Sequence, residues 1–209
     1  MQKQNEDIKH RLIIAQEKQT CESCAYRESG HVVFAYLQGY SCLEMQIMKT
    51  ADDEGLFSYS LIDYKSDESI ALTFIGEKAD DQFFRNLSLA QRLQTIEVGG
   101  KLARLFIGGS VATAVFRNNG DAQIPIPMQM DYEDLVKVEY IHQVLRVLMI
   151  NSEVDFMENE IAGALYTVSN SYVWNSIDAI AKRLLEESYL AKNDVEECLE
   201  KTGLLPLFA

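Results

Sequence analysis

Apolar residues recur at helical spacing through most of the second half of this chain, and this pattern constrains the fold more than any other feature. From about residue 80 the period is close to that of an α-helix. Leu135, Val138 and Ile141 fall on one face of a predicted helix, and Ile177 falls within another. Only three prolines and eleven glycines interrupt the 209 residues, so few positions can break a helix or mark a linker. The sequence therefore predicts one compact, mainly helical domain.

A small β element is predicted ahead of this helical part. Residues 43–48 and 57–61 each alternate apolar and polar side chains, as half-buried strands do, and an acidic turn at 52–55 separates them. The second segment has one polar face, which is typical of an edge strand. A helix over residues 21–38, ended by Gly39, precedes both. The predicted fold class is therefore mainly α, with a minor antiparallel component (α+β).

The remaining segments are assigned from their spacing and breakers. Residues 5–19 could form a polar helix. A long helix is predicted over 80–107, with a break at the glycine pair 108–109 and a short helix over 110–116. Because no lysine follows the glycine pair, close helix packing explains it better than phosphate binding. Residues 118–130 carry two of the three prolines and are predicted to be a loop.

Charge and hydropathy exclude several classes of partner. Lys and Arg number 19 against 32 Asp and Glu, which gives a net charge of −13. No nucleic acid partner is expected, since phosphate binding requires cationic surface. No membrane span is expected either, because the longest apolar run, residues 102–116, has 15 residues where a span needs about 20. The polar residues 1–6 do not resemble a signal peptide, so a cytoplasmic location is expected.

The four cysteines do not form a recognisable metal pattern. Cys21 and Cys24 have C-x-x-C spacing, but a structural zinc site needs a second ligand pair, and Cys42 and Cys198 are isolated. Two reduced thiols at the start of a helix are the simpler interpretation.

The segment 25–31, A-Y-R-E-S-G-H, carries the most specific chemistry in the chain. In the zinc peptidase motif H-E-x-x-H, the histidines are four residues apart so that both imidazoles reach one metal from one helix face. The glutamate beside the first histidine takes a proton from the metal-bound water. Glu28 and His31 hold the second and fifth positions of this motif, and Arg27 holds the first.

This segment resembles the A-Y-H-E-A-G-H helix of the FtsH peptidase family, and further segments are similar in family order. Residues 55–60, G-L-F-S-Y-S, resemble the family's edge strand, and 106–112, F-I-G-G-S-V-A, resemble the end of its long helix. Asp134 and Leu135 fit the slot of the third zinc ligand, and residues 174–199 resemble the closing helix.

The resemblance covers about residues 21–203 and implies a zincin-like FtsH peptidase-domain fold without the ATPase module. It implies an N-terminal helical extension over 1–20 and a peptidase-like domain over 21–209, with the active-site helix and β element in 21–65 and the helical part in 78–209. Glu28 would be the general base, and His31 and Asp134 would be zinc ligands. The strand implied to bind an extended polypeptide carries Phe57, Ser58 and Tyr59.

Arg27 conflicts with this chemistry. An arginine stays protonated and offers no lone pair to zinc, so His31 and Asp134 leave the site one short of the usual three ligands. His142 lies eight residues from Asp134, about 12 Å along a helix, and His10 could reach only if the N-terminal helix folded back. Arg27 could instead form an ion pair with Asp134 as an organic substitute for zinc, or it could point to solvent.

Two functions remain open at this point. The first is a catalytically degenerate FtsH-type peptidase that binds a polypeptide or protein partner or serves in assembly, with no cofactor. The second is an active zinc endopeptidase that cleaves unfolded polypeptides through Glu28, His31, Asp134 and an unrecognised third ligand. A homo-oligomer is compatible with either function. The missing first ligand at Arg27 favours the degenerate protein.

Overall fold

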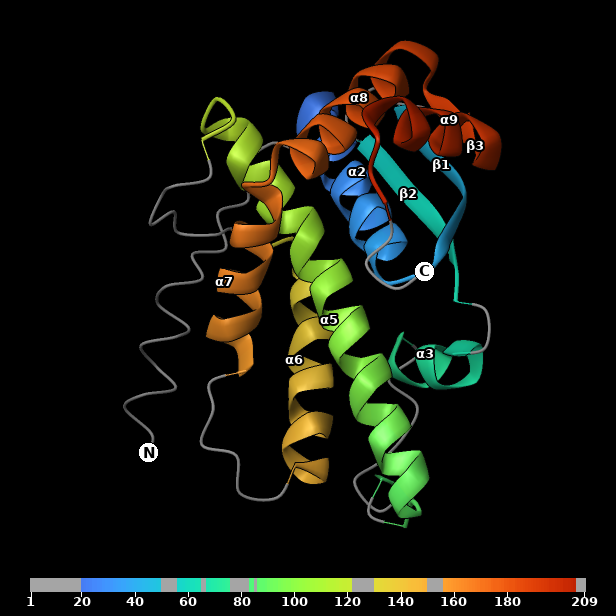
Figure 1. The fold of residues 1–209 in the computed structure, drawn as a ribbon, viewed down its shortest axis with the longest axis vertical. Helices are drawn as coiled ribbons and strands as arrows, with labels where there is room; N and C mark the ends of the chain where they lie inside the picture. The colour runs from blue at the N-terminus through green and yellow to red at the C-terminus, as the bar shows by residue number, and fades with distance from the viewer. Residues whose placement is uncertain are drawn as a thin grey trace.

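The structure is a computed structural model that describes residues 20–49, 56–64, 67–75, 83–84, 86–121, 130–149 and 156–205. The predicted helix over 5–19, the extension over 1–20 except Thr20, and most of the loop at 118–130 lie outside the described residues. The elements (Figure 1) are α2 (Cys21–Leu37), β1 (Ser41–Lys49), β2 (Leu56–Asp63), α3 (Glu68–Ile75), α5 (Leu89–Arg117), α6 (Tyr132–Leu148), α7 (Phe156–Val168), α8 (Ser171–Glu187), β3 (Tyr189–Ala191) and α9 (Lys192–Thr202).

Helix α2 lies at the centre of the molecule. Thr20 caps its start, because the Thr20 hydroxyl accepts a hydrogen bond from the Ser23 amide at 3.2 Å. Gly39 follows its end with a positive φ of 82°, which a glycine adopts without strain. Nearly all of its side chains are buried, since α5, α8 and both long strands pack around it. The helix predicted over 21–38 is confirmed, and Glu28 and His31 in its middle are held in a largely dry environment.

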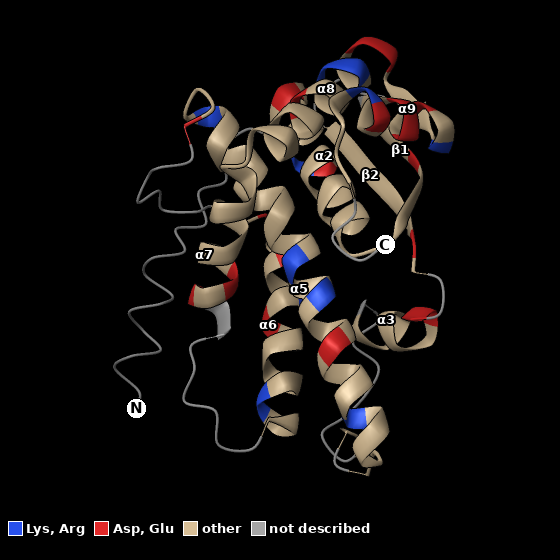
Figure 2. Cartoon of the chain, in the orientation of Figure 1, with Lys and Arg blue, Asp and Glu red and all other residues tan. Residues whose placement is uncertain are grey.

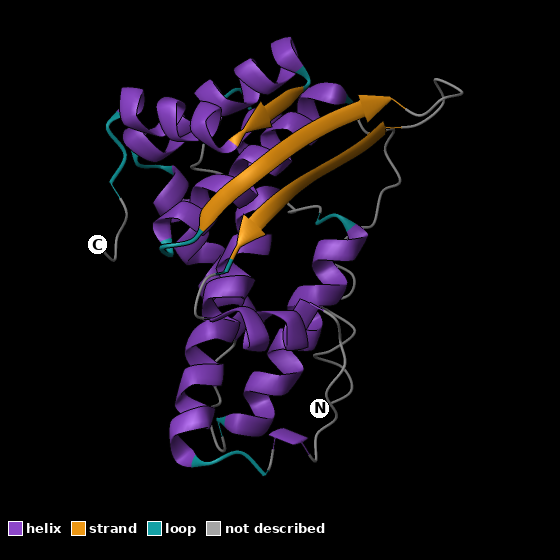
Figure 3. Cartoon of the chain, turned by 90° about the vertical axis from the view of Figure 1, so that its right-hand side faces the viewer, coloured by secondary structure: helices purple, strands orange, loops and turns teal. Residues whose placement is uncertain are grey.

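The three strands form an antiparallel sheet in the order β2-β1-β3. Helices lie behind the sheet when it is viewed face-on (Figure 3). Both predicted strands are confirmed, and β2 is an edge strand as its polar face indicated. Strand β3 was not predicted, because three residues are too few for an alternation pattern to be recognised.

Helix α5 continues through residues 108–109, so the predicted break at the glycine pair is wrong. A Cβ atom on Gly30 of α2 would lie 2.6 Å from the Gly108 carbonyl oxygen, and one on Gly109 would overlap the His31 ring. The glycines therefore permit the close crossing of α2 and α5. Glycine costs about 1 kcal/mol in a helix interior, and tertiary packing overrides this local preference. The helix also begins at Leu89 rather than near residue 80.

The other helices complete the core behind and below the sheet. The amphipathic patterns predicted for α6 and α8 are confirmed, since Val138, Ile141, Ile177 and Leu184 are all buried. Helices α3 and α7 were not predicted. Within the described part of the chain, no helix has both the length and the apolar composition needed to cross a membrane. The structure is thus mainly helical with one small antiparallel sheet, in agreement with the predicted fold class.

Candidate functional site

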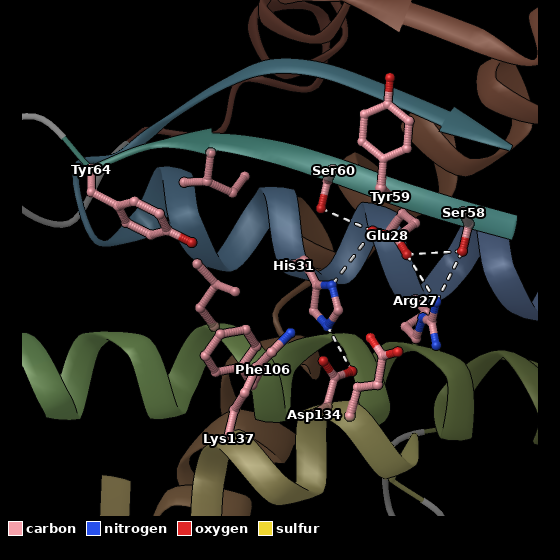
Figure 4. Close-up of a pocket in the computed structure, with 13 residues that line it drawn as sticks. Arg27, Glu28, His31, Ser58, Tyr59, Ser60, Tyr64, Phe106, Asp134 and Lys137 are labelled. Carbon is pink, nitrogen blue, oxygen red and sulfur yellow. Dashed lines mark hydrogen bonds and ion pairs between the residues drawn. The ribbon is translucent and has the colours of Figure 1, made fainter. Parts of the chain in front are cut away.

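A cavity of about 240 Å³ opens between α2, β2, α5 and α6 (Figure 4). It brings together most of the residues that the sequence predicted for the site. Those that line it are Arg27, Glu28, His31, Ser58, Tyr59 and Asp134. Phe57 does not line it, and the Tyr59 ring, which alternation places on the same side of β2 as Phe57, points away from the cavity (Figure 4). The candidate site therefore lies where α2, β2 and α6 meet.

The carboxylate of Glu28 is buried and surrounded by donors. Its Oε1 accepts hydrogen bonds from Arg27 Nη2 at 3.1 Å and Ser58 Oγ at 2.9 Å. Its Oε2 accepts one from Ser60 Oγ at 2.9 Å and lies 3.6 Å from His31 Nδ1. These four contacts occupy the lone-pair directions that a carboxylate offers. Burial alone would raise the pKa of Glu28, but His31, Arg27 and Ser60 lower it to about 2.

His31 lies between two carboxylates. Its Nδ1 faces Glu28, and its Nε2 lies 3.1 Å from Asp134 Oδ2. Burial alone would lower the pKa of His31, but the charge and hydrogen bond of Asp134, together with those of Glu28, raise it to about 9. Without a metal ion, the charged imidazole is therefore favoured at neutral pH, with one ring nitrogen directed at each carboxylate.

Arg27 is held by ion pairs and does not point to solvent. Its Nη1 lies 2.5 Å from Asp131 Oδ2, and its Nη2 also donates to Ser58 Oγ at 2.9 Å. The suggested ion pair with Asp134 is wrong, because His31 binds Asp134 and the guanidinium meets Asp131 instead. Burial alone would lower the pKa of Arg27, but Glu28, Asp131 and Asp134 outweigh it and raise that pKa.

Asp131 and Ser60 belong to the site but were given no role from the sequence. Asp131 is the N-cap of α6, because its Oδ1 accepts from the Glu133 amide at 3.0 Å while its Oδ2 binds Arg27. Its position just before an apolar periodic segment was the available signal. Ser60 lies on the predicted polar face of the edge strand, which gave no indication of its partner. Both contacts depend on how α6 and β2 approach α2.

The donor set does not fit a catalytic zinc ion. Among the residues that the structure describes, no group of three or more His, Cys, Asp or Glu side chains is placed to hold a metal. Glu28 and His31 are engaged with each other and with neighbouring groups, and the Arg27 cation lies in the same cluster. Cys24 does not supply a thiolate, since burial raises the pKa of its thiol. Each carboxylate of the cluster is therefore paired with Arg27 or His31.

Comparisons with known proteins assign neither a family nor a function to this chain. No protein-family model matches the sequence, and a search of curated proteins finds no match. The function is therefore inferred from the motif and from the geometry of the cavity.

Proposed function

We propose that this protein is a catalytically inactive relative of the FtsH-type zinc peptidases that binds polypeptide as an interaction or assembly module. The resemblance of residues 25–31 to the family helix supports this proposal. The convergence of Glu28, His31 and Asp134 in one cavity supports it as well, because the family's chemistry needs these positions close together. A zincin-like fold is part of the same proposal.

The main support for a loss of catalysis is that both oxygens of the Glu28 carboxylate are already bound by neighbouring donors. A general base works best when its pKa lies near the operating pH. Because His31, Arg27 and Ser60 lower the pKa of Glu28 to about 2, this carboxylate has little tendency to take a proton from water. Arg27, Ser58 and Ser60 also occupy the lone pairs that such a water would use. The site thus lacks both a competent base and a third metal ligand.

Polypeptide binding is supported by the position of β2. It is the outer strand of the described sheet, and the cavity opens beside Ser58 and Ser60. Backbone groups along the free edge of such a strand can pair with an added extended chain. A bound segment would lie against the cavity without meeting an activated water, so it would be held and not cleaved.

Fluorescent casein provides a direct test of this proposal. With added zinc, we expect binding of unfolded casein, measured by anisotropy, but no release of fragments over hours. Glu28→Gln serves as the control, because it removes the proposed base while keeping side-chain volume. Zinc-dependent cleavage that disappears in Glu28→Gln and on chelation would instead establish the active endopeptidase.

A further inference from the structure

The face of the sheet that points away from α2 exposes a continuous group of large apolar side chains. Phe57 is 53% exposed and Leu61 is 48% exposed, although both lie in a regular strand. No element that the structure describes covers this face in Figure 3. We call it the outer sheet face and define it by Met48, Phe57, Leu61 and Tyr189, together with Glu44 and Tyr59.

A single carboxylate occupies the middle of this face. Tyr59 on β2 and Tyr189 on β3 both pair with Gln46 of β1, so their rings flank the central strand. The Tyr59 hydroxyl donates to Glu44 Oε1 at 2.9 Å, and the Tyr189 hydroxyl donates to Glu44 Oε2 at 3.2 Å. The Phe57 ring lies 5.8 Å from the Tyr59 ring. Glu44 is therefore oriented by two phenols within an aromatic surface.

Among the described residues, Glu44 has no oppositely charged partner. Throughout the described parts of the chain, no lysine or arginine forms an ion pair with Glu44, whereas most cations of α8 and α9 are paired with acidic residues of the same two helices. Figure 2 shows basic and acidic residues close together along these helices. A cation that approaches Glu44 would meet the carboxylate and two tyrosine hydroxyl oxygens, which favours Lys or Arg. The exposed apolar residues around it favour an amphipathic ligand.

The width of the sheet indicates the shape of that ligand. Three strands spaced about 4.8 Å apart span roughly 10 Å, which is about the diameter of one α-helix. A sheet with helices on one side and apolar residues on the other is completed by a second helical layer. One helix would therefore cover the exposed side chains.

We propose that the outer sheet face binds an amphipathic helix of a basic partner protein and that Glu44 receives a Lys or Arg from the apolar side of this helix. A second copy of this chain is a poorer occupant. In a two-fold symmetric dimer the same patch is presented by both subunits, so Glu44 would face an equivalent acid, and each chain carries a net charge of −13. A basic partner would supply the complementary charge that neither a second copy nor the described part of this chain offers.

A synthetic 18-residue helix with a leucine stripe flanked by lysines is a suitable probe, with a peptide carrying glutamate in place of lysine as its counterpart. Anisotropy of the labelled peptides with the full-length chain should show binding of the lysine peptide only. Glu44→Gln should weaken it about tenfold, and Phe57→Ser should weaken it comparably. Glu139→Gln and Leu93→Ser are the matched controls, since these exposed residues lie on α6 and α5.

Equal losses in the Glu44 and Glu139 variants would overturn the proposal, because the peptide would then respond to net charge alone. Equal binding of the glutamate peptide would overturn it as well. These outcomes are separate from the casein experiment, since casein is expected at the β2 edge and its binding should persist in Glu44→Gln.

Discussion

The two faces of strand β2 are built from alternating residues of one short segment. They differ in whether the carboxylate that lies against each face has a cationic partner. On the inner face, Ser58 and Ser60 donate to the buried Glu28, which also meets Arg27. On the outer face, Phe57 is exposed, and the carboxylate near it, Glu44, contacts only neutral partners among the described residues. A carboxylate that is already bound by internal cations and hydroxyls is not available as a general base. A carboxylate on the surface with neutral partners can still bind a cationic ligand.

Removal of Arg27 should produce the largest effect, because it breaks the inner cluster. Arg27→Ala would leave the buried Glu28 with His31 as its remaining cation and would remove the partner of Asp131. Loss of one member of a buried ion pair typically costs about 3–5 kcal/mol. Urea denaturation should show a decrease of this size in the free energy of unfolding. A decrease below about 1 kcal/mol, as for an exposed pair, would contradict the buried network.

The stability of the protein should depend on pH through the same cluster. The pKa of Glu28 lies near 2, below its ordinary value of 4.5, so its contribution is present above that ordinary value and is lost as pH falls toward 2. The pKa of His31 is raised from 6.5 to about 9, so its contribution is full below the ordinary value and is lost as pH rises through 9. Thermal melts should therefore show maximal stability between these ranges.

A matched pair of histidine variants isolates the alkaline part of this profile. His31→Gln should flatten the loss of stability between the neutral range and pH 9, while His142→Gln should retain it. If both variants keep the same alkaline slope, His31 is not the group responsible.

A smaller contrast is expected between single hydroxyl groups on the two faces. Ser60→Ala removes a hydrogen bond to the buried Glu28 and should lower the free energy of unfolding by about 1.5–3 kcal/mol. Tyr59→Phe removes a half-buried hydrogen bond to Glu44, which remains bonded to Tyr189, and should lower the free energy of unfolding by less than about 1 kcal/mol. Urea titrations of both variants provide the comparison. A larger decrease in the free energy of unfolding for Tyr59→Phe than for Ser60→Ala would contradict the account of the two faces.

The elements that could be predicted from the sequence are those with a long local pattern. Periodicity indicated α2, α6 and α8, and alternation indicated β1 and β2. The break expected at residues 108–109 was wrong because local propensity does not include the packing of His31 and α2 against those glycines. Short elements such as β3 offer too few residues for a pattern.

Part of the site could also be predicted, because some of its residues belong to one local sequence pattern. Fixed helical spacing relates Glu28 to His31, and the motif resemblance added Asp134. The bonds of Arg27 to Asp131 and of Ser60 to Glu28 link residues that are far apart in sequence. Their existence depends on the tertiary approach of α6 and β2 to α2, which no local pattern encodes.

The metal content of the protein tests most directly whether a guanidinium has replaced the zinc ion. Protein purified from zinc-supplemented cells would be analysed by inductively coupled plasma mass spectrometry beside the Arg27→His variant, in which a third ligand is available. We expect substoichiometric zinc in the natural protein and about one zinc per chain in the variant. One zinc per natural chain, with casein cleavage abolished in Glu28→Gln, would contradict the proposed replacement.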